Sequence, residues 1–384
     1  MLSGIMDHLL HDLSKSQRPS LLIGGGCQNY KETFYALADK LKIPAFPTWN
    51  ALDIVSSDLP CYGGRVGTYG GAGRNFGIQN CDLLLSIGSR LSGRITGGLP
   101  ETFAPKAKKY FVDIDPALLE PEFQQVKADV NIFVDAGEFM TALTKAYQPK
   151  DFSTWNARVQ EWRRKYDPVK PEHFEGLHHY GFMRELSKFM PDNAIITADT
   201  GGNVITFAHA FDTKKGQRYI TNNGNTPMGF SLAAAIGAWF AEPQRPIFCI
   251  IGDGGFQFNI QELQTVKHYN VPVKIFVFNN KCLGNTRSFQ LQNYGGRTIA
   301  CGPEGYSVPD FVEIARAYEL DGYRATEKWD LHAIPMLLAK EKAIVVDVQH
   351  DMFCDYQPRM VRWDRGIECM EPELPEQEMM ENMK

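Results

Sequence analysis

Two short motifs place residue types that bind metal and phosphate at the ends of successive apolar segments. A GDGG motif at residues 252–255 ends the apolar run 246–253, and Asn280 ends the next run, 27 positions after Asp253. A carboxylate oxygen and an amide oxygen suit Mg²⁺, which completes its coordination with phosphate and water. Glycines allow backbone N–H groups to approach a phosphate closely. The pair predicts a magnesium–phosphate site, and the alternative is a tight turn followed by a helix cap.

Such a site requires both motifs to lie at one edge of a sheet. In an open parallel sheet, ligands bind beyond the carboxyl ends of the strands. Short apolar runs alternate with helical stretches along the chain, which predicts an α/β fold with two doubly wound parallel-sheet domains. The predicted strands are residues 20–24, 43–48, 82–88, 110–115, 194–199, 246–253, 273–280 and 343–348.

The character of the sequence changes twice along the chain. We expect a first domain over residues 1–150, and a linker over 151–176 that is rich in Trp, Arg, Lys and Pro and contains a short helix. A second domain follows over 177–362. The acidic, Met-rich end, 363–384, shows no clear period and predicts a mobile arm or a surface-packed terminus.

Composition excludes several classes of protein. A length of 384 residues predicts two or three domains, and a net charge of −5 gives no basic footprint for nucleic acid. The run 228–241 is shorter than a membrane span, and the N-terminus lacks a secretory pattern. Eight cysteines without a CxxC pair favour reduced thiols. We therefore expect a cytoplasmic protein with no membrane role. His173, His178 and His179 are expected to be surface residues, because no ligand spacing for zinc accompanies them.

Several segments resemble one family. The stretch 252–280 is similar to the diphosphate-and-metal signature of thiamine diphosphate (ThDP) enzymes. GNTPMGFSLAAAIGA at residues 224–238 narrows the resemblance to the acetolactate (acetohydroxyacid) synthase family. RPSLLIGGGCQN (18–29), NCDLLLSIGSRLSGRITG (80–97) and YFVDIDPA (110–117) resemble the central domain of the same family.

The resemblance implies roles for residues of the second domain. Asp253 and Asn280 would bind Mg²⁺, with the backbone carbonyl of Cys282 as a third ligand. Met228 would be the apolar wedge that bends the cofactor, and plain core packing is the alternative for this residue. The remaining residues implied to bind ThDP are Gly202, Asn203, Gly252, Gly254 and Gly255.

The resemblance also implies FAD in the first domain, where it has a structural role in the family's carboligases. Two arginines could clamp a diphosphate, and glycines could let the chain press against an extended ligand. The alternative is a flavin-free domain with surface ion pairs and a mobile glycine loop. The residues implied to bind FAD are Gly67, Gly70, Arg90, Arg94, Asp113, Asp115 and Asp129.

Three departures from the family pattern affect the expected chemistry. The chain begins at the central domain, so the pyrimidine-binding domain and its glutamate are expected to come from another chain or from a longer form of the protein. Asn203 and Val204 stand where the synthases have Gln-His, and only the Asn can donate to phosphate. Asn285 and Phe289 stand at the acceptor-pocket positions of a Met and a Trp, which predicts a more polar pocket.

The resemblance implies a 2-oxoacid decarboxylase and carboligase that depends on ThDP and Mg²⁺. Enzymes of this kind act in branched-chain amino acid biosynthesis. A 2-oxoacid such as pyruvate would lose CO₂, and its acyl group would be transferred to a carbonyl acceptor. The protein would act as a homo-oligomer or with a separate pyrimidine-domain chain. The alternatives are another ThDP decarboxylase or oxidase, and a non-catalytic or regulatory subunit.

Overall fold

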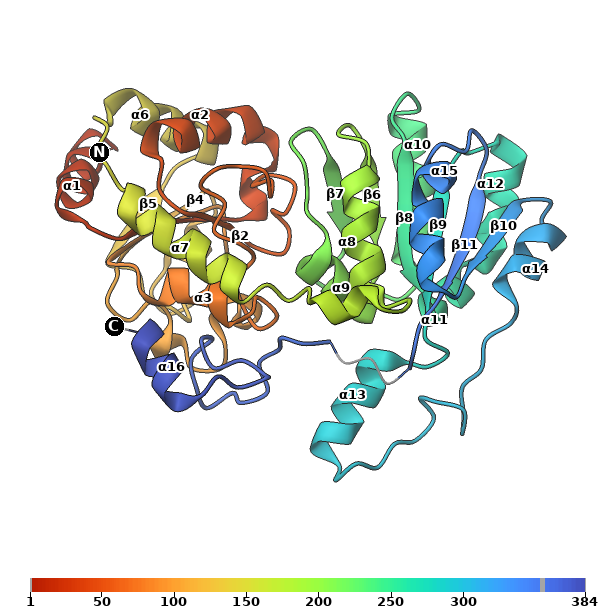
Figure 1. Ribbon diagram of the computed structural model, residues 1–384. Helices are drawn as coiled ribbons and strands as arrows, with labels where there is room; N and C mark the ends of the chain where they lie inside the picture. The colour runs from red at the N-terminus through yellow and green to blue at the C-terminus, as the bar shows by residue number, and fades with distance from the viewer. Residues whose placement is uncertain (1, 353–355, 384) are drawn as a thin grey trace. The chain divides into compact units, whose positions relative to one another are not determined.

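The chain folds into two compact units. The computed structural model describes residues 2–352 and 356–383. Unit 1 comprises Met1–Pro168 together with Gln357–Lys384, and unit 2 comprises Val169–Tyr356 (Figure 1). Unit 1 is therefore built from both ends of the sequence.

Unit 1 contains a five-stranded sheet in the order β2-β1-β3-β4-β5, with every pairing parallel. Alternate residues of β1 enter different cores, because side chains of a strand point to opposite faces. Leu21 and Ile23 pack in one core, and Leu22 packs in the other. The strands are β1 (Pro19–Ile23), β2 (Ala45–Pro47), β3 (Leu83–Ile87), β4 (Lys108–Asp113) and β5 (Val130–Phe133).

Helices cover both faces of this sheet. One face carries α1 (Leu2–Lys15), α2 (Lys31–Leu41) and α6 (Ala136–Ala146), and the other carries α3 (Ala72–Gln79) and α7 (Ser153–Lys165). The shorter elements are α4 (Gly93–Thr96), α5 (Pro116–Leu119), η1 (Gly25–Tyr30) and η2 (Pro100–Thr102).

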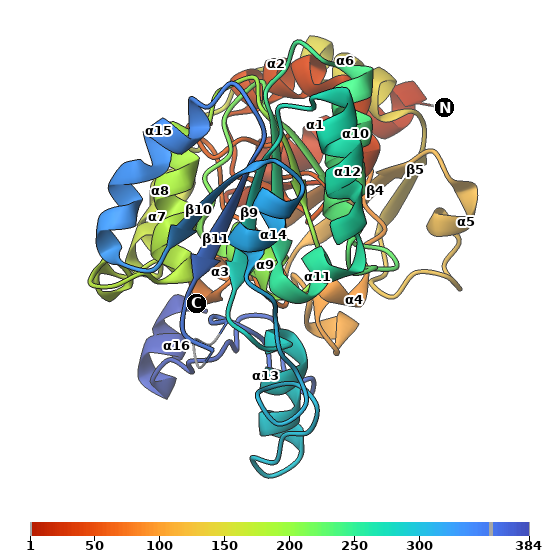
Figure 2. The same cartoon turned by 90° about the vertical axis from the view of Figure 1, so that its right-hand side faces the viewer.

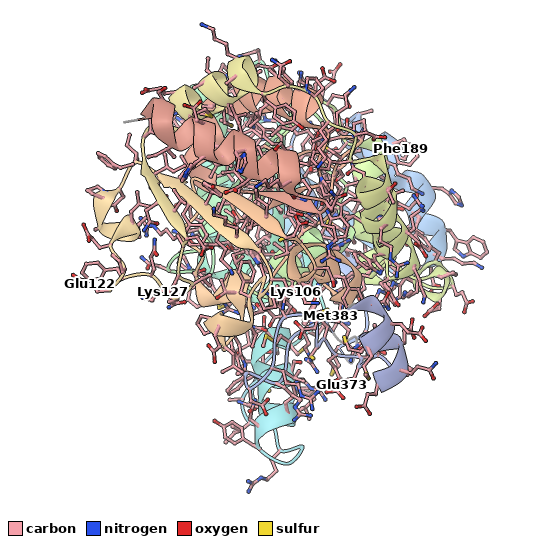
Figure 3. The ribbon with its side chains drawn as sticks, turned by 90° about the vertical axis from the view of Figure 1, so that its left-hand side faces the viewer. Lys106, Glu122, Lys127, Phe189, Glu373 and Met383 are labelled. Atoms are coloured by element: carbon pink, nitrogen blue, oxygen red, sulfur yellow. The ribbon has the colours of Figure 1, made fainter. Side chains whose placement is uncertain are left out.

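The expected linker and tail both contribute to the body of unit 1. Helix α7 lies within residues 151–176, and Trp155 and Trp162 on it are buried in the core. The terminal segment packs on the same core and ends in α16 (Glu376–Asn382). In Figure 3, Met383 lies beside α16, and Glu373 points outward from the surface. Met360, Ile367 and Met370 are buried in this core, which explains why a segment without helical period is still held in place.

Unit 2 contains a six-stranded parallel sheet in the order β10-β11-β9-β8-β6-β7. The doubly wound α/β fold class predicted from the sequence is confirmed in both units. The strands are β6 (Ile195–Ala198), β7 (Arg218–Thr221), β8 (Ile247–Gly252), β9 (Lys274–Asn279), β10 (Asp321–Ala325) and β11 (Ile344–Gln349).

Helices lie on both sides of the second sheet as well (Figure 2). On one side are α8 (His179–Phe189), α9 (Gly202–Ala210) and α15 (Ile334–Leu338). On the other are α10 (Phe230–Ala241), α12 (Leu263–Tyr269) and α14 (Phe311–Ala317), which bury Leu232, Val266 and Phe311 against the strands. The remaining elements are α11 (Asp253–Phe258), α13 (Gly284–Asn293), η3 (Pro171–Phe174), η4 (Ile260–Glu262) and η5 (Lys328–Ala333).

Candidate functional site: a cleft at the strand ends of unit 2

The two motifs meet at the carboxyl edge of the second sheet. The chain passes from β6 outward to β7 and then returns across β6 to form β8, so the strand order reverses there. Ligands of doubly wound folds bind at such a reversal. A cleft of about 160 Å³ lies at this edge. It is lined by Thr200, Gly201, Gly202, Asn203, Thr206, Met228, Gly252, Asp253, Gly254, Gly255, Phe278, Asn280, Cys282, Leu283, Gly284, Asn285, Thr286, His350 and Tyr356.

Asp253 offers an unpaired carboxylate oxygen in this cleft. The residue is 3% exposed at the start of α11, and its Oδ1 accepts the Gly254 N–H at 2.7 Å. Its Oδ2 is buried and has no hydrogen-bond partner among residues 2–352 and 356–383. Burial raises the pKa of Asp253 to about 7, and the backbone hydrogen bond from Gly254 partly offsets this. A bound cation would satisfy Oδ2 and hold the carboxylate in its charged form.

Asn280 faces the same cleft from the end of β9. Its Oδ1 accepts the Cys282 N–H at 3.3 Å across a turn in which Lys281 has a φ of +56°. The preceding Asn279 points elsewhere, because its amide donates to Asp347 at 2.8 Å. Asp253 and Asn280 therefore line the same cleft, and their role as metal ligands stays a prediction. Cys282 lines the cleft too, and the role of its backbone carbonyl as a metal ligand stays a prediction.

The start of α9 forms another wall. Gly201 has a φ of +88°, a conformation that favours glycine, and turns the chain into the helix. Asn203 is buried, and its amide nitrogen donates to the Thr200 carbonyl at 2.8 Å. Its Oδ1 has no hydrogen-bond partner among the described residues. The first N–H groups of a helix suit an anion, so this wall can hold a phosphate group.

Met228 lies in the cleft, 37% exposed, on a turn held by an aspartate that the sequence analysis missed. Asp199, at the end of β6, accepts the Gly229 N–H at 3.0 Å and the Ser231 N–H at 3.3 Å. Burial raises the pKa of Asp199, and these backbone hydrogen bonds partly offset the effect. Asp199 thereby fixes the backbone that follows Met228. An aspartate directly after a buried strand was the available signal, and it is the same signal that identified Asp253.

The two residues assigned to an acceptor pocket separate in the structure. Asn285 lines the cleft, whereas Phe289, one turn later on α13, is 56% exposed and is not part of its wall. Among the aromatic residues that line the cleft, His350 and Tyr356 were not selected from the sequence. They follow β11, another strand that ends at this edge.

One expectation about histidines is wrong. His179 was expected on the surface, but it is 1% exposed. Its ring contacts those of His178 and His350, with centroid distances of 4.3 and 4.9 Å. The reason is that His179 begins α8, whose apolar face packs against the sheet and carries this position inward.

Four of the residues assigned to FAD in unit 1 lie in the loop around residues 67–70 and in the segment that follows β3. Gly67 and Arg94 are neighbours, because a Cβ at Gly67 would lie 2.3 Å from the Arg94 carbonyl oxygen. Gly70 lies in the same loop, and Arg90 is exposed after β3.

The three aspartates of the FAD set have other partners. Asp113 accepts the Asp115 N–H at 3.0 Å, and Asp115 caps α5 by accepting the Ala117 N–H. Asp129 accepts the Lys109 N–H at 2.7 Å, which places it at the start of β4, whereas Asp113 is the last residue of that strand. Asp129 is therefore at the opposite edge of the sheet from Asp113.

The described residues contain neither a cluster of metal-ligating side chains nor a membrane-spanning helix. Among them, no cluster of three or more His, Cys, Asp or Glu side chains could hold a metal ion, so a cation in the cleft must rely on Asp253 together with amide and backbone oxygens. None of the helices in residues 2–352 and 356–383 has both the length and the apolar character to cross a bilayer.

Comparison with known proteins agrees with this architecture. The thiamine pyrophosphate enzyme central domain matches residues 6–143, and the thiamine pyrophosphate enzyme C-terminal TPP binding domain matches residues 199–348. Together the two matches cover most of the chain, which therefore belongs to the thiamine pyrophosphate enzymes. Within that family, its similarity is to the large subunits of acetolactate synthase, and the resemblance inferred from the sequence is confirmed.

Three relatives show the extent of the similarity. The probable acetolactate synthase large subunit of Methanocaldococcus jannaschii is 35% identical over 319 residues, covering 80% of this chain and 53% of the relative. Acetolactate synthase isozyme 2 large subunit of Escherichia coli is 34% identical, covering 84% and 57%. Acetolactate synthase 1, chloroplastic, of Zea mays is 30% identical, covering 86% and 53%. The chain spans a little over half the length of these relatives.

Proposed function

We propose that unit 2 binds ThDP with Mg²⁺, and that the protein takes part in decarboxylation of a 2-oxoacid and transfer of the acyl group to a carbonyl acceptor. The observation that carries the proposal is the buried, unpaired Oδ2 of Asp253, in a cleft that also contains Asn280 and the first turn of α9. Mg²⁺ binds few protein oxygens and keeps phosphate and water as its other ligands, so this donor set fits it.

Each wall of the cleft has a separate role in this proposal. Asp253, Asn280 and the Cys282 carbonyl hold the metal ion, and the glycine-rich walls with Asn203 hold the diphosphate. Met228 supports the bent cofactor from the turn that Asp199 fixes. When bound, the cofactor supplies stabilisation of a carbanion equivalent, and the protein supplies binding and orientation.

A partner domain forms part of the proposal. Helix α10, which follows Met228, is almost entirely apolar, and helices of this kind are normally buried on all sides. Its exposed residues are also apolar and recur at helical spacing: Ala233, Gly237, Phe240 and Ala241. We propose that this face receives a pyrimidine-binding domain with the activating glutamate, supplied by another chain or by a longer form of the protein.

Isothermal titration calorimetry of ThDP in saturating Mg²⁺ tests the site. Asp253→Ala should weaken metal-dependent binding at least about a hundredfold, because loss of groups that merely support metal ligands already costs 10–100-fold. Asp192→Ala is the matched control, since its side chain is 79% exposed and pairs with Lys214 at the surface. Equal affinity of the Asp253 variant and the wild type would exclude the proposed site.

The products separate the proposed reaction from its alternatives. An acyloin formed from pyruvate in the presence of a pyrimidine-domain chain supports carboligation, whereas an aldehyde or acyl phosphate indicates another ThDP decarboxylase or oxidase. Tight ThDP binding without turnover in any combination indicates a non-catalytic subunit. Asn285 in the cleft wall favours a polar acceptor.

FAD in unit 1 remains a separate proposal. Gly67, Gly70, Arg90 and Arg94 support it, and the position of Asp129 at the other edge of the sheet does not. Flavin absorbance of the purified protein tests it, and absence of flavin after reconstitution with FAD would exclude it.

A further inference from the structure

The diphosphate end of the cleft contains a tyrosine. A Cβ built on Gly202 would lie 2.0 Å from the Tyr356 hydroxyl, and one built on Gly284 would lie 2.6 Å from it. The hydroxyl therefore lies between the start of α9 and the start of α13. It also accepts a long hydrogen bond, 3.4 Å, from the amide nitrogen of Asn280. The phenol thus lies among the groups that the proposed function assigns to phosphate and metal.

A buried imidazole supports the Tyr356 ring from behind. The His179 ring stacks on it, with centroids 5.4 Å apart and an angle of 17° between the rings. His179 also contacts His350 and Tyr180 edge to face. Neither ring nitrogen of His179 has a hydrogen-bond partner among the described residues, so the ring acts here as a flat packing surface. Burial lowers the pKa of His179 far below its usual value, which keeps the imidazole neutral and the stack free of charge repulsion.

We propose that Tyr356 controls cofactor affinity by occupying the diphosphate position of the cleft, where His179 holds its ring. The proposal rests on the proposed function. A phosphate group at the mouth of α9 and the phenol cannot both lie against Gly202, because the hydroxyl is already in contact with that backbone. Binding must therefore displace the tyrosine side chain.

Displacement reduces the observed affinity. A ligand that binds only the fraction of molecules with an open site has an apparent Kd that is larger by the inverse of this fraction. Breaking the hydrogen bond with Asn280 and the ring stack with His179 contributes roughly a fivefold to thirtyfold effect. Tyr356→Ala is accordingly expected to bind ThDP about fivefold to thirtyfold more tightly than the wild type.

Calorimetry with ThDP and saturating Mg²⁺ compares four variants with the wild type. Tyr356→Phe loses only the hydroxyl and should show a smaller gain than Tyr356→Ala. His179→Leu keeps bulk but removes the stacked ring, and it should show an intermediate gain. Tyr269→Ala is the matched control, because Tyr269 is half exposed on α12 and lies outside the cleft. Equal or weaker binding by both Tyr356 variants would overturn the proposal, and weaker binding would identify the hydroxyl as a ligand.

A second measurement uses only the wild-type protein, so it does not depend on whether a variant folds. Tetranitromethane nitrates accessible tyrosines, and peptide mass spectrometry locates the modified residue. Tyr356 is 6% exposed, so we expect it to be protected in the free protein and nitrated after Mg²⁺ and ThDP are added. Unchanged protection would contradict displacement.

Failure of this inference differs from failure of the proposed function. If the wild type binds ThDP, Asp253→Ala does not, and Tyr356→Ala matches the wild type, only the role of Tyr356 is refuted. If neither the wild type nor Tyr356→Ala binds ThDP, both proposals fail. Binding by Tyr356→Ala alone would support complete blockage by the tyrosine.

Discussion

At the residue scale, the cleft depends on a carboxylate that is costly to bury. Asp253 has one oxygen paired with a backbone N–H and one without a partner, and its pKa is raised to about 7. In the unfolded chain the same group has a pKa near 3.8. Between these values the folded protein holds a proton that the unfolded chain releases. The free protein is therefore destabilised as the pH rises through this window.

This linkage predicts a pH-dependent difference between the wild type and Asp253→Asn. The variant cannot ionise, so its free energy of unfolding should exceed that of the wild type by a margin that grows from pH 4 to pH 8, reaching at most about 4 kcal/mol. Urea denaturation without metal measures it. Adding Mg²⁺ and ThDP should stabilise the wild type more at pH 8 than at pH 5. A constant margin across this range would show that Asp253 is ionised throughout.

At the scale of elements, the turn between β7 and α10 is fixed in part by a side chain from another strand. Asp199 accepts two backbone N–H groups of this turn from the end of β6. These groups are buried, so removal of their acceptor leaves them unsatisfied.

We expect Asp199→Ala to lower the free energy of unfolding by about 1–3 kcal/mol and to weaken ThDP binding, because Met228 loses its fixed position. Urea denaturation and calorimetry measure the two effects. Asp212→Ala is a control for the loss of a carboxylate, since its side chain is 53% exposed. If stability falls while affinity is unchanged, the turn does not position the cofactor.

The sequence predicted all the interior strands of both sheets, but of the four edge strands it predicted only β2. Residues 246–253 and 273–280 are continuous apolar runs because helices cover both faces of a parallel sheet. By contrast, β7 and β10 lie at the edges and contain polar residues such as Arg218 and Asp321, and they were not predicted.

The residues of the candidate site were likewise predictable from local pattern only where they directly follow a buried strand. Asp253 and Asn280 were selected because each directly ends a buried strand, and both line the cleft. Tyr356 was not found, because its place depends on how the chain folds back after β11 and on the His179 ring, and no local spacing encodes either. Phe289 is the opposite case, because it was predicted to line the pocket and does not. Its position in the sequence matched a pocket residue, but the orientation of α13 leaves the side chain exposed.

At the scale of the whole molecule, residues 357–383 complete the core of unit 1. The Asn382 side chain accepts the Trp162 indole N–H at 2.6 Å, and its amide donates to the Tyr166 hydroxyl at 2.9 Å and to the Glu378 carbonyl. This residue joins α16 to α7 across more than 200 positions of sequence.

Asn382→Ala should therefore lower the free energy of unfolding of unit 1 by about 1–3 kcal/mol, because the buried Trp162 indole loses its acceptor. Trp fluorescence during urea denaturation reports on the change. Gln377→Ala, an exposed substitution on the same helix, should change stability by less than about 0.5 kcal/mol. Similar losses in both variants would mean that α16 contributes through its helical content alone.

The return of residues 357–383 to unit 1 also has a consequence during synthesis on the ribosome. Domains generally fold in the order in which they emerge. Here the sheet of unit 1 emerges first, yet the groups that cover Trp162 and Phe76 are translated only after all of unit 2. A nascent chain thus carries part of this aromatic surface uncovered while unit 2 is translated, a period in which chaperones that bind exposed apolar segments would have their target.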